Sequence, residues 1–124
     1  MTTELELSSL PIIDWDAAIK TAGNKKEVAE ELLNFLCKTL RDDVKAIHQA
    51  FADNQFKELL QRVHKLHGGV SYCGLPRLKK LLMAMETNIK KNDVADFHSL
   101  LHQLEVETER LLSEQAKVDS FHNH

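Results

Sequence analysis

The sequence predicts an all-α protein: an antiparallel four-helix bundle with up-down-up-down topology and a short extra helix at its N-terminal end. Three observations favour this fold class. The 124 residues suffice for one domain and include only four glycines and two prolines, so they offer few of the turns that a β-protein needs. Nineteen leucines stand against twelve valines and isoleucines together, a bias toward helix. Apolar residues also recur every three or four positions, as on one face of a helix.

Two end segments are predicted to lie outside the helical domain. Residues 1–11 form an expected flexible N-terminal tail, residues 12–117 the domain, and residues 118–124 a C-terminal tail that frays because its helical periodicity is lost. The longest unbroken apolar run, residues 81–85, is far too short to cross a bilayer. The N-terminal end carries acidic residues where a signal peptide has basic ones, so the chain is expected in the cytoplasm, without membrane contact of its own.

Two helices are expected in the first half of the chain. Asp14 is a good N-cap for a short first helix, and Gly23 allows that helix to end in the left-handed conformation. Asn24 and Glu27 have the spacing of a capping box, which predicts that a second helix begins there. This second helix should be about 36 Å long for some two dozen residues. Its expected buried face consists of Leu33, Cys37, Leu40, Val44, Ile47 and Phe51.

Three further helices are expected after connections of only a few residues, which makes neighbouring helices antiparallel. The third starts after Asp53 and ends near Gly74, with the inward positions Phe56, Leu59, Leu60, Val63, Leu66 and Val70. Pro76 suits the first turn of the fourth, whose inward positions are Leu78, Leu81, Leu82, Met85 and Ile89. Asp93 is expected to cap the fifth, whose inward positions are Val94, Phe97, Leu101, Leu104, Thr108 and Leu111.

Charge is unevenly distributed along the chain. The net charge of −3 argues against nucleic-acid binding, and Glu105, Glu107 and Glu109 should form a solvated face. Residues 57–80, in contrast, hold six lysines and arginines against one glutamate, a net charge of +5. A basic face on an acidic protein predicts a docking surface for an acidic partner.

Several kinds of chemistry are disfavoured by the motifs. No glycine is followed by lysine and there is no G-x-G pair, so the chain lacks the known phosphate-binding loops and is not a complete ATP-using kinase. Cys37 and Cys73 are too few for a zinc quartet or a disulfide framework and are expected to be reduced and packed. His98 and His102 are four residues apart and could bind a metal, but bundle metal sites use Glu-x-x-His pairs, which this sequence lacks. Neither a metal nor an intrinsic cofactor is therefore expected.

The most informative segment runs from Val63 to Gly74 and reads V-H-K-L-H-G-G-V-S-Y-C-G. On a helix His64 lies about 100° from Val63, at the margin of the apolar face, so its imidazole should reach solvent. Gly68 lies one turn later on the same side and leaves the surface beside His64 open, because a side chain there would normally cover it. Two adjacent glycines inside a helix cost roughly 1 kcal/mol each relative to alanine, which packing alone rarely requires. An exposed imidazole beside an open surface is suited to accept a transferred group.

This segment, with its continuation L-P-R-L and the upstream stretch I-I-D-W-D-A-A-I-K-T-A-G-N, resembles histidine-containing phosphotransfer (HPt) domains. The resemblance covers residues 12–115 and is closest to the C-terminal HPt domains of BarA/GacS-type hybrid sensor histidine kinases. It implies that His64 is the phosphorylated histidine. It also implies that Gly68 is the glycine that clears the space around this histidine, and that Gly74 closes the helix.

One position departs from the family pattern His-x-x-Lys-Gly. His67 stands where the family has lysine, so Lys65 and His67 are both candidates for steadying the phosphoryl group. For His67, a packed and hydrogen-bonded role is an equal alternative. Contacts with the partner are expected on the surface around His64, from Lys57, Gln61, Arg62, Gly69, Arg77 and Lys79.

A phosphorelay carrier of two-component signalling is the function that the resemblance implies. His64 would accept a phosphoryl group from the aspartate of one receiver domain and pass it to the aspartate of a response regulator. Mg²⁺ is expected on the receiver, and the carrier itself is a shuttle, not an independent kinase. The parent protein is expected to be a hybrid sensor kinase, which can be anchored in the inner membrane. The alternative function is a helical adaptor that binds partners without chemistry.

Overall fold

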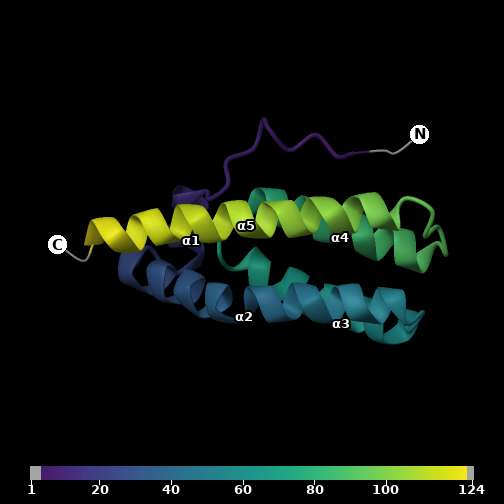
Figure 1. The fold of residues 1–124 in the computed structure, drawn as a ribbon. Helices are drawn as coiled ribbons and strands as arrows, with labels where there is room; N and C mark the ends of the chain where they lie inside the picture. The colour runs from purple at the N-terminus through teal and green to yellow at the C-terminus, as the bar shows by residue number, and fades with distance from the viewer. Residues whose placement is uncertain (1–3, 123–124) are drawn as a thin grey trace.

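The structure is a computed structural model that describes residues 4–122, with side chains through Val118. Five helices make up the fold: α1 (Trp15–Thr21), α2 (Lys26–Ala52), α3 (Phe56–Ser71), α4 (Pro76–Lys90) and α5 (Phe97–His122). Helices α2 to α5 run antiparallel to their neighbours along the chain, and α1 packs at one end against α2 (Figure 1). The predicted all-α bundle with a short N-terminal helix is confirmed. Within the described residues no helix has both the length and the apolar character that a bilayer span requires.

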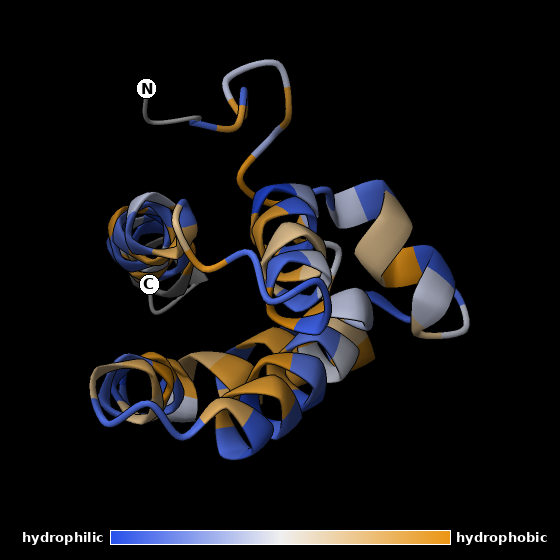
Figure 2. Cartoon of the chain, turned by 90° about the vertical axis from the view of Figure 1, so that its right-hand side faces the viewer, coloured by the Kyte–Doolittle hydropathy of each residue, from blue (hydrophilic) through white to orange (hydrophobic). Residues whose placement is uncertain are grey.

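The core lies between the four long helices, each of which is apolar on one side. Viewed along the bundle axis, the helices carry hydrophobic and hydrophilic residues around their circumference, as amphipathic helices do (Figure 2). The prediction for α4 is confirmed at every position, because Leu78, Leu81, Leu82, Met85 and Ile89 are all buried. Met83, in contrast, is half exposed and does not fill the core.

The buried face of α2 differs from the expected one at two of six positions. Leu36 and Ala50 are buried there, whereas their neighbours Cys37 and Phe51 are only partly buried. Leu33, Leu40, Val44 and Ile47 are buried as expected, and Cys37 and Phe51 still pack against the core from its edge.

Helix starts agree with the sequence for α1 and for α4, which begins at Pro76 as expected. Asp14 is the N-cap of α1 and accepts a hydrogen bond from the backbone N–H of Ala17 at 3.1 Å. The capping box predicted at Asn24 is wrong, because Asn24 has a positive φ of 65° and Lys25 precedes α2 without a side-chain cap. Asn54 and Asn92 also have positive φ values, as in the left-handed residue that ends many helices.

Asn54 and Asn92 each lie at the end of a helix. Neither Asp53, which precedes Asn54, nor Asp93, which follows Asn92, therefore caps the start of the next helix. Asp53 is the C-cap of α2, and the backbone N–H of Gln55 donates back to the carbonyl of Ala50 at 2.9 Å. The N–H of Asp93 donates in the same way to the carbonyl of Asn88 at 2.9 Å. The expected cap at Asp93 is therefore wrong, and α5 begins only at Phe97.

Both ends of the described chain are more ordered than the sequence predicts. Leu7 is buried in the core, and the side-chain amide of Gln103 donates to and accepts from the backbone of Leu5, at 3.0 Å each way. The described part of residues 1–11 therefore packs on the bundle, which differs from the expected flexible tail. At the other end the helical backbone of α5 continues to His122, past the expected boundary at Val118.

Gly74 joins the end of α3 to the start of α1, and only glycine fits there. It has a φ of +64°, its carbonyl accepts from the backbone N–H of Asp14 at 2.8 Å, and an added Cβ would lie 2.9 Å from Cβ of Ala18. Gly74→Ala is therefore expected to lower the free energy of unfolding by about 3 kcal/mol, from left-handed strain plus overpacking. Urea unfolding measures this loss.

The matched control is Gly23→Ala. Gly23 has a similar φ of +69°, but an added Cβ would meet no atom within 4 Å. This variant should lose only the conformational part, about 1 to 2 kcal/mol. Equal losses in the two variants would show that the close packing at Gly74 has no energetic weight.

Candidate functional site

His64 lies on α3 at the margin that faces α4. Its neighbour Val63 is fully buried, whereas the side chain of His64 is 76% exposed. The structure thus confirms that this imidazole reaches solvent. Its Nδ1 lies 3.2 Å from Oε1 of Glu86 on α4, so one ring nitrogen is engaged by the protein.

Glu86 contacts two histidines with one oxygen. Its Oε1 also lies 3.1 Å from Nδ1 of His67, one turn further along α3. An ionised carboxylate only accepts hydrogen bonds, so the Nδ1 of each histidine donates. The Glu86 side chain is 12% exposed and that of His67 20%, so both belong to the interface between α3 and α4.

Sequence reasoning missed Glu86. One signal was available, because Glu86 is the only carboxylate of α4 and directly follows the buried Met85. That position puts it at the margin of the apolar face, as His64 is on α3. The spacing within one helix does not show which residue of the next helix lies opposite, so the pairing itself requires the structure.

The two glycines of α3 face different surroundings. An added Cβ at Gly68 would meet nothing within 4 Å, so the surface one turn after His64 is open. An added Cβ at Gly69 would lie 3.5 Å from Cδ1 of Leu36 on α2, an ordinary contact. The space that the sequence predicts beside His64 is thus provided by Gly68, while Gly69 lies against α2.

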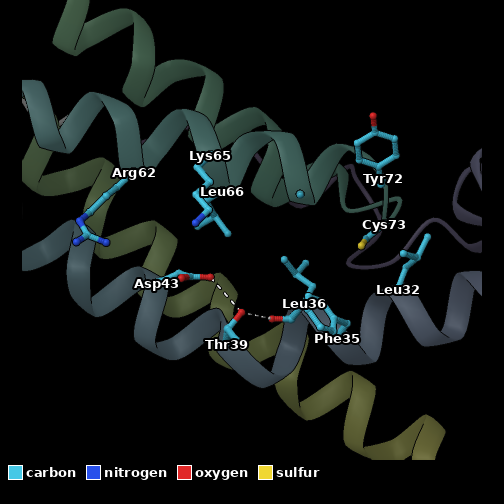
Figure 3. A pocket seen from close by; sticks show the side chains of 11 residues that line it. Leu32, Phe35, Leu36, Thr39, Asp43, Arg62, Lys65, Leu66, Tyr72 and Cys73 are labelled. Carbon is cyan, nitrogen blue, oxygen red and sulfur yellow. Dashed lines mark hydrogen bonds between the residues drawn. The ribbon is translucent and has the colours of Figure 1, made fainter.

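A groove of about 280 Å³ separates α2 and α3 on the side where Gly69 lies. Arg62 and Lys65 extend from α3 toward α2 in this groove, and Tyr72 points away from it (Figure 3). Phe35 and Tyr72 are 75% and 60% exposed, which is unusual for aromatic side chains. Lys65 therefore lines the α2 flank of α3, whereas the contact between His64 and Glu86 lies on the α4 flank.

Comparison with known protein families identifies the family of this chain. The profile of the family described as Hpt domain matches residues 31–114, most of the chain. The chain belongs to the Hpt domain family. Members of this family are phosphorelay carriers in two-component signalling, so the predicted family and function class are confirmed.

The curated relatives of this Hpt domain are much longer proteins, and the domain matches one part of each. Sensor histidine kinase GacS of Pseudomonas protegens is 36% identical over 91 residues, which are 73% of this chain and 10% of that protein. The histidine-protein kinase BarA of Escherichia coli strain K12 is 25% identical over 93% of this chain and 13% of its own length. The chain thus spans about a tenth of these curated relatives. A crystal structure of the HPt domain of a hybrid histidine kinase from Shewanella superimposes with a TM-score of 0.79 and 30% identity, covering 88% of this chain and 94% of that one.

Most of the basic residues predicted to bind the partner lie on the surface of the Hpt domain. Lys57, Gln61 and Lys79 are exposed. Arg62 is also exposed and pairs with Glu58 at 3.0 Å along the same helix, which leaves its charge at the surface. We call these four exposed side chains and Lys65 the basic surface; all but Lys79 lie on α3, Lys79 lies near the start of α4, and Gln61 is the one uncharged member.

Arg77 is mostly buried, unlike the other basic residues that were predicted to contact the partner. Its side chain is only 16% exposed, its Nε donates to the carbonyl of Leu10 at 2.8 Å, and its Nη1 lies 3.3 Å from Oε1 of Glu107. Glu107 is 3% exposed and also binds Arg110 at 2.6 Å. The expected solvated position of Glu107 is wrong, because burying this carboxylate requires cationic partners.

The structure also shows the surroundings of His98 and of the two cysteines. The imidazole of His98 packs edge-on against the ring of Phe51, with centroids 4.8 Å apart. Within residues 4–122, no three metal-ligating side chains gather as a metal site would require. Both cysteines are thiols, and burial raises the pKa of Cys73 to about 11, which keeps it protonated and unreactive at neutral pH.

Proposed function

We propose that this Hpt domain carries a phosphoryl group on His64 between two receiver domains. The observation that carries the proposal is the 76% exposed imidazole of His64, held by Glu86 on a packed helix beside the open surface at Gly68. A neutral imidazole keeps one nitrogen lone pair and is a nucleophile at physiological pH. An exposed ring that is fixed on one side can meet a phosphoryl donor on the other.

The proposed reaction needs no group bound to this chain. The nitrogen lone pair forms a bond to phosphorus while the bond from phosphorus to the aspartyl oxygen of the first receiver breaks, and the carboxylate leaves with the electron pair. The second transfer is the reverse, onto the aspartate of a response regulator. Mg²⁺ on each receiver would neutralise the charge of the transferring group, so the Hpt domain has only to position its nucleophile.

The proposed partners are the receiver domain of a hybrid sensor kinase and that of a response regulator. Support comes from the relatives, which are named as sensor kinases, and from the basic surface formed by Lys57, Gln61, Arg62, Lys65 and Lys79. We propose neither nucleic acid nor a membrane surface as a partner. We also propose that the reaction takes place in the cytoplasm.

Transfer of a labelled phosphoryl group tests this function. The chain is mixed with a receiver domain phosphorylated with ³²P on its aspartate, and the chain is then isolated. We expect a label on the chain that is labile in acid and stable in base, as phosphohistidine is. A helical adaptor would bind the receiver without acquiring the label, and that result would replace the proposal by the alternative function.

Docking of the receiver is expected to depend on the basic surface. Reversal of Lys57, Arg62, Lys65 and Lys79 to glutamate should slow association by about tenfold or more at low salt, because steering by charge is lost. The salt dependence of association should largely disappear with it, since exposed charges are screened within about 10 Å at 0.1 M salt. Stopped-flow association rates at several salt concentrations measure both effects.

The matched control reverses four exposed lysines elsewhere, Lys20, Lys25, Lys26 and Lys45. It changes the net charge equally and should leave association much closer to that of the parent chain. If the first variant still associates quickly and with the same salt dependence, the receiver docks by other contacts, such as the apolar side chains at the groove between α2 and α3.

A further inference from the structure

Residues 4–10, which we call the strap, run along α4 and α5 before the chain enters α1. They lie on the side of the bundle away from α2 and α3 (Figure 1). Leu7 is buried and Leu5 is partly buried, whereas Glu4 and Glu6 are exposed. Every second side chain of this stretch thus faces the helices, as in a β-strand that packs on one face.

Side chains of the helices hold the strap by its backbone. The amide of Gln103 on α5 accepts from the N–H of Leu5 and donates to its carbonyl, at 3.0 Å each way, as a neighbouring β-strand would. On α4, Lys80 donates to the carbonyl of Glu6 at 2.9 Å. Within the described part of the chain, each hydrogen bond between strap and helices joins a helix side chain to strap backbone. These contacts are therefore available to other sequences as well.

Positive charge surrounds the strap on α4 and α5. Arg77 donates to the carbonyl of Leu10 at 2.8 Å, and Lys80 and Arg110 are exposed. Glu107, which pairs with both arginines, is the one acidic residue among the described helix side chains that hold the strap or line the cavity beside it. The strap itself carries two glutamates and no cation. The site on the helices is therefore basic, and the segment that occupies it is acidic.

We propose that α4 and α5 form a binding site for an acidic, extended peptide segment of a partner, and that the strap is the built-in competitor for this site. The partner segment carries two aliphatic side chains two positions apart, at the places of Leu5 and Leu7. Backbone contacts supply affinity and the two apolar positions supply specificity, as where a peptide adds to a sheet edge. A cavity of about 390 Å³ beside the strap leaves room for larger side chains. This inference does not depend on the proposed phosphotransfer.

The first test releases the strap in the full-length chain. Leu7→Ser removes its buried anchor without changing any charge, and Leu5→Ser is a second release variant at a less buried position. The probe is a fluorescent peptide with the sequence of residues 4–11 and blocked ends. Both variants should bind it more tightly than the parent chain by about tenfold or more, because the tethered strap occupies the site in the parent. Fluorescence anisotropy measures the dissociation constants.

The second test locates the bound peptide and defines its chemistry. In the Leu7→Ser chain, Gln103→Ala should weaken binding by about tenfold, because two hydrogen bonds to the peptide are lost. Gln61→Ala, at an exposed glutamine of α3, is the matched control and should have no effect. A peptide with lysine in place of both glutamates should bind more weakly by about fivefold or more at low salt. A peptide with isoleucine and valine in place of the first two leucines should bind nearly as well as the original.

Several results would overturn the proposal. If neither release variant binds the peptide although circular dichroism shows the helix content of the parent, the strap is only a structural end segment. If both variants lose their helix content, the strap is part of the core and not a separable competitor. Equal binding to the parent and to the release variants would mean that the peptide binds elsewhere. Equal binding of the lysine peptide would contradict the acidic character of the partner.

Discussion

A His64→Gln variant is expected to lose phosphoryl acceptance completely while it keeps the stability of the parent chain. Glutamine has no nucleophilic nitrogen, so the N–P bond cannot form. The free energy of unfolding should change by less than about 0.5 kcal/mol, because the side chain of His64 is mostly exposed and contributes little packing. Labelling from a phosphorylated receiver and urea unfolding measure the two quantities on the same sample.

His102→Gln is the matched control, since His102 is an exposed histidine on α5. It should accept the label at the rate of the parent chain. Efficient labelling of His64→Gln would place the phosphorylated residue elsewhere, and a large loss of stability would mean that His64 has a structural role that its exposure does not suggest.

Replacing Gly68 is expected to change stability and function in opposite directions. An added side chain there meets no atom within 4 Å, so Gly68→Ala should stabilise the chain by up to about 1 kcal/mol through helix propensity alone. Gly68→Leu should also stabilise it, but its longer side chain leans toward the N-terminal end of α3 and covers the surface beside His64. Transfer should therefore decrease with side-chain size, slightly for alanine and strongly for leucine.

Urea unfolding and single-turnover transfer rates of both variants test this size dependence. A leucine variant that transferred at the normal rate would contradict the steric role of Gly68. A variant that was less stable than the parent would show instead that the open space beside Gly68 is not available to a side chain.

Features that depend on periodicity within one helix could be predicted from the sequence. The inward face of α4 and the exposure of His64 are of this kind, because a helix of fixed pitch determines them from spacing alone. The helix starts could be predicted less well. Asparagine in the left-handed conformation ends a helix, while the same residue also suits an N-cap, and the sequence at Asn24 does not distinguish the two.

Features that depend on two helices together could not be predicted. Arg77 and Glu107 were assigned to separate exposed surfaces, and only the packing of α4 against α5 shows that they pair. Glu86 was missed for the same reason. Leu5 and Leu7 lie in a segment that is polar on average, and their burial depends on a surface formed by residues far along the chain.

Helix α3 has two flanks that belong to different parts of the molecule. Its α4 flank holds His64, His67 and the carboxylate of Glu86, and its α2 flank borders the groove with Phe35. Substitutions on α2 can therefore reshape the groove without altering any atom that holds the imidazole. In a duplicated gene, mutations on α2 would be free to diversify the groove, while the α3–α4 hairpin would stay under selection for the geometry that holds His64.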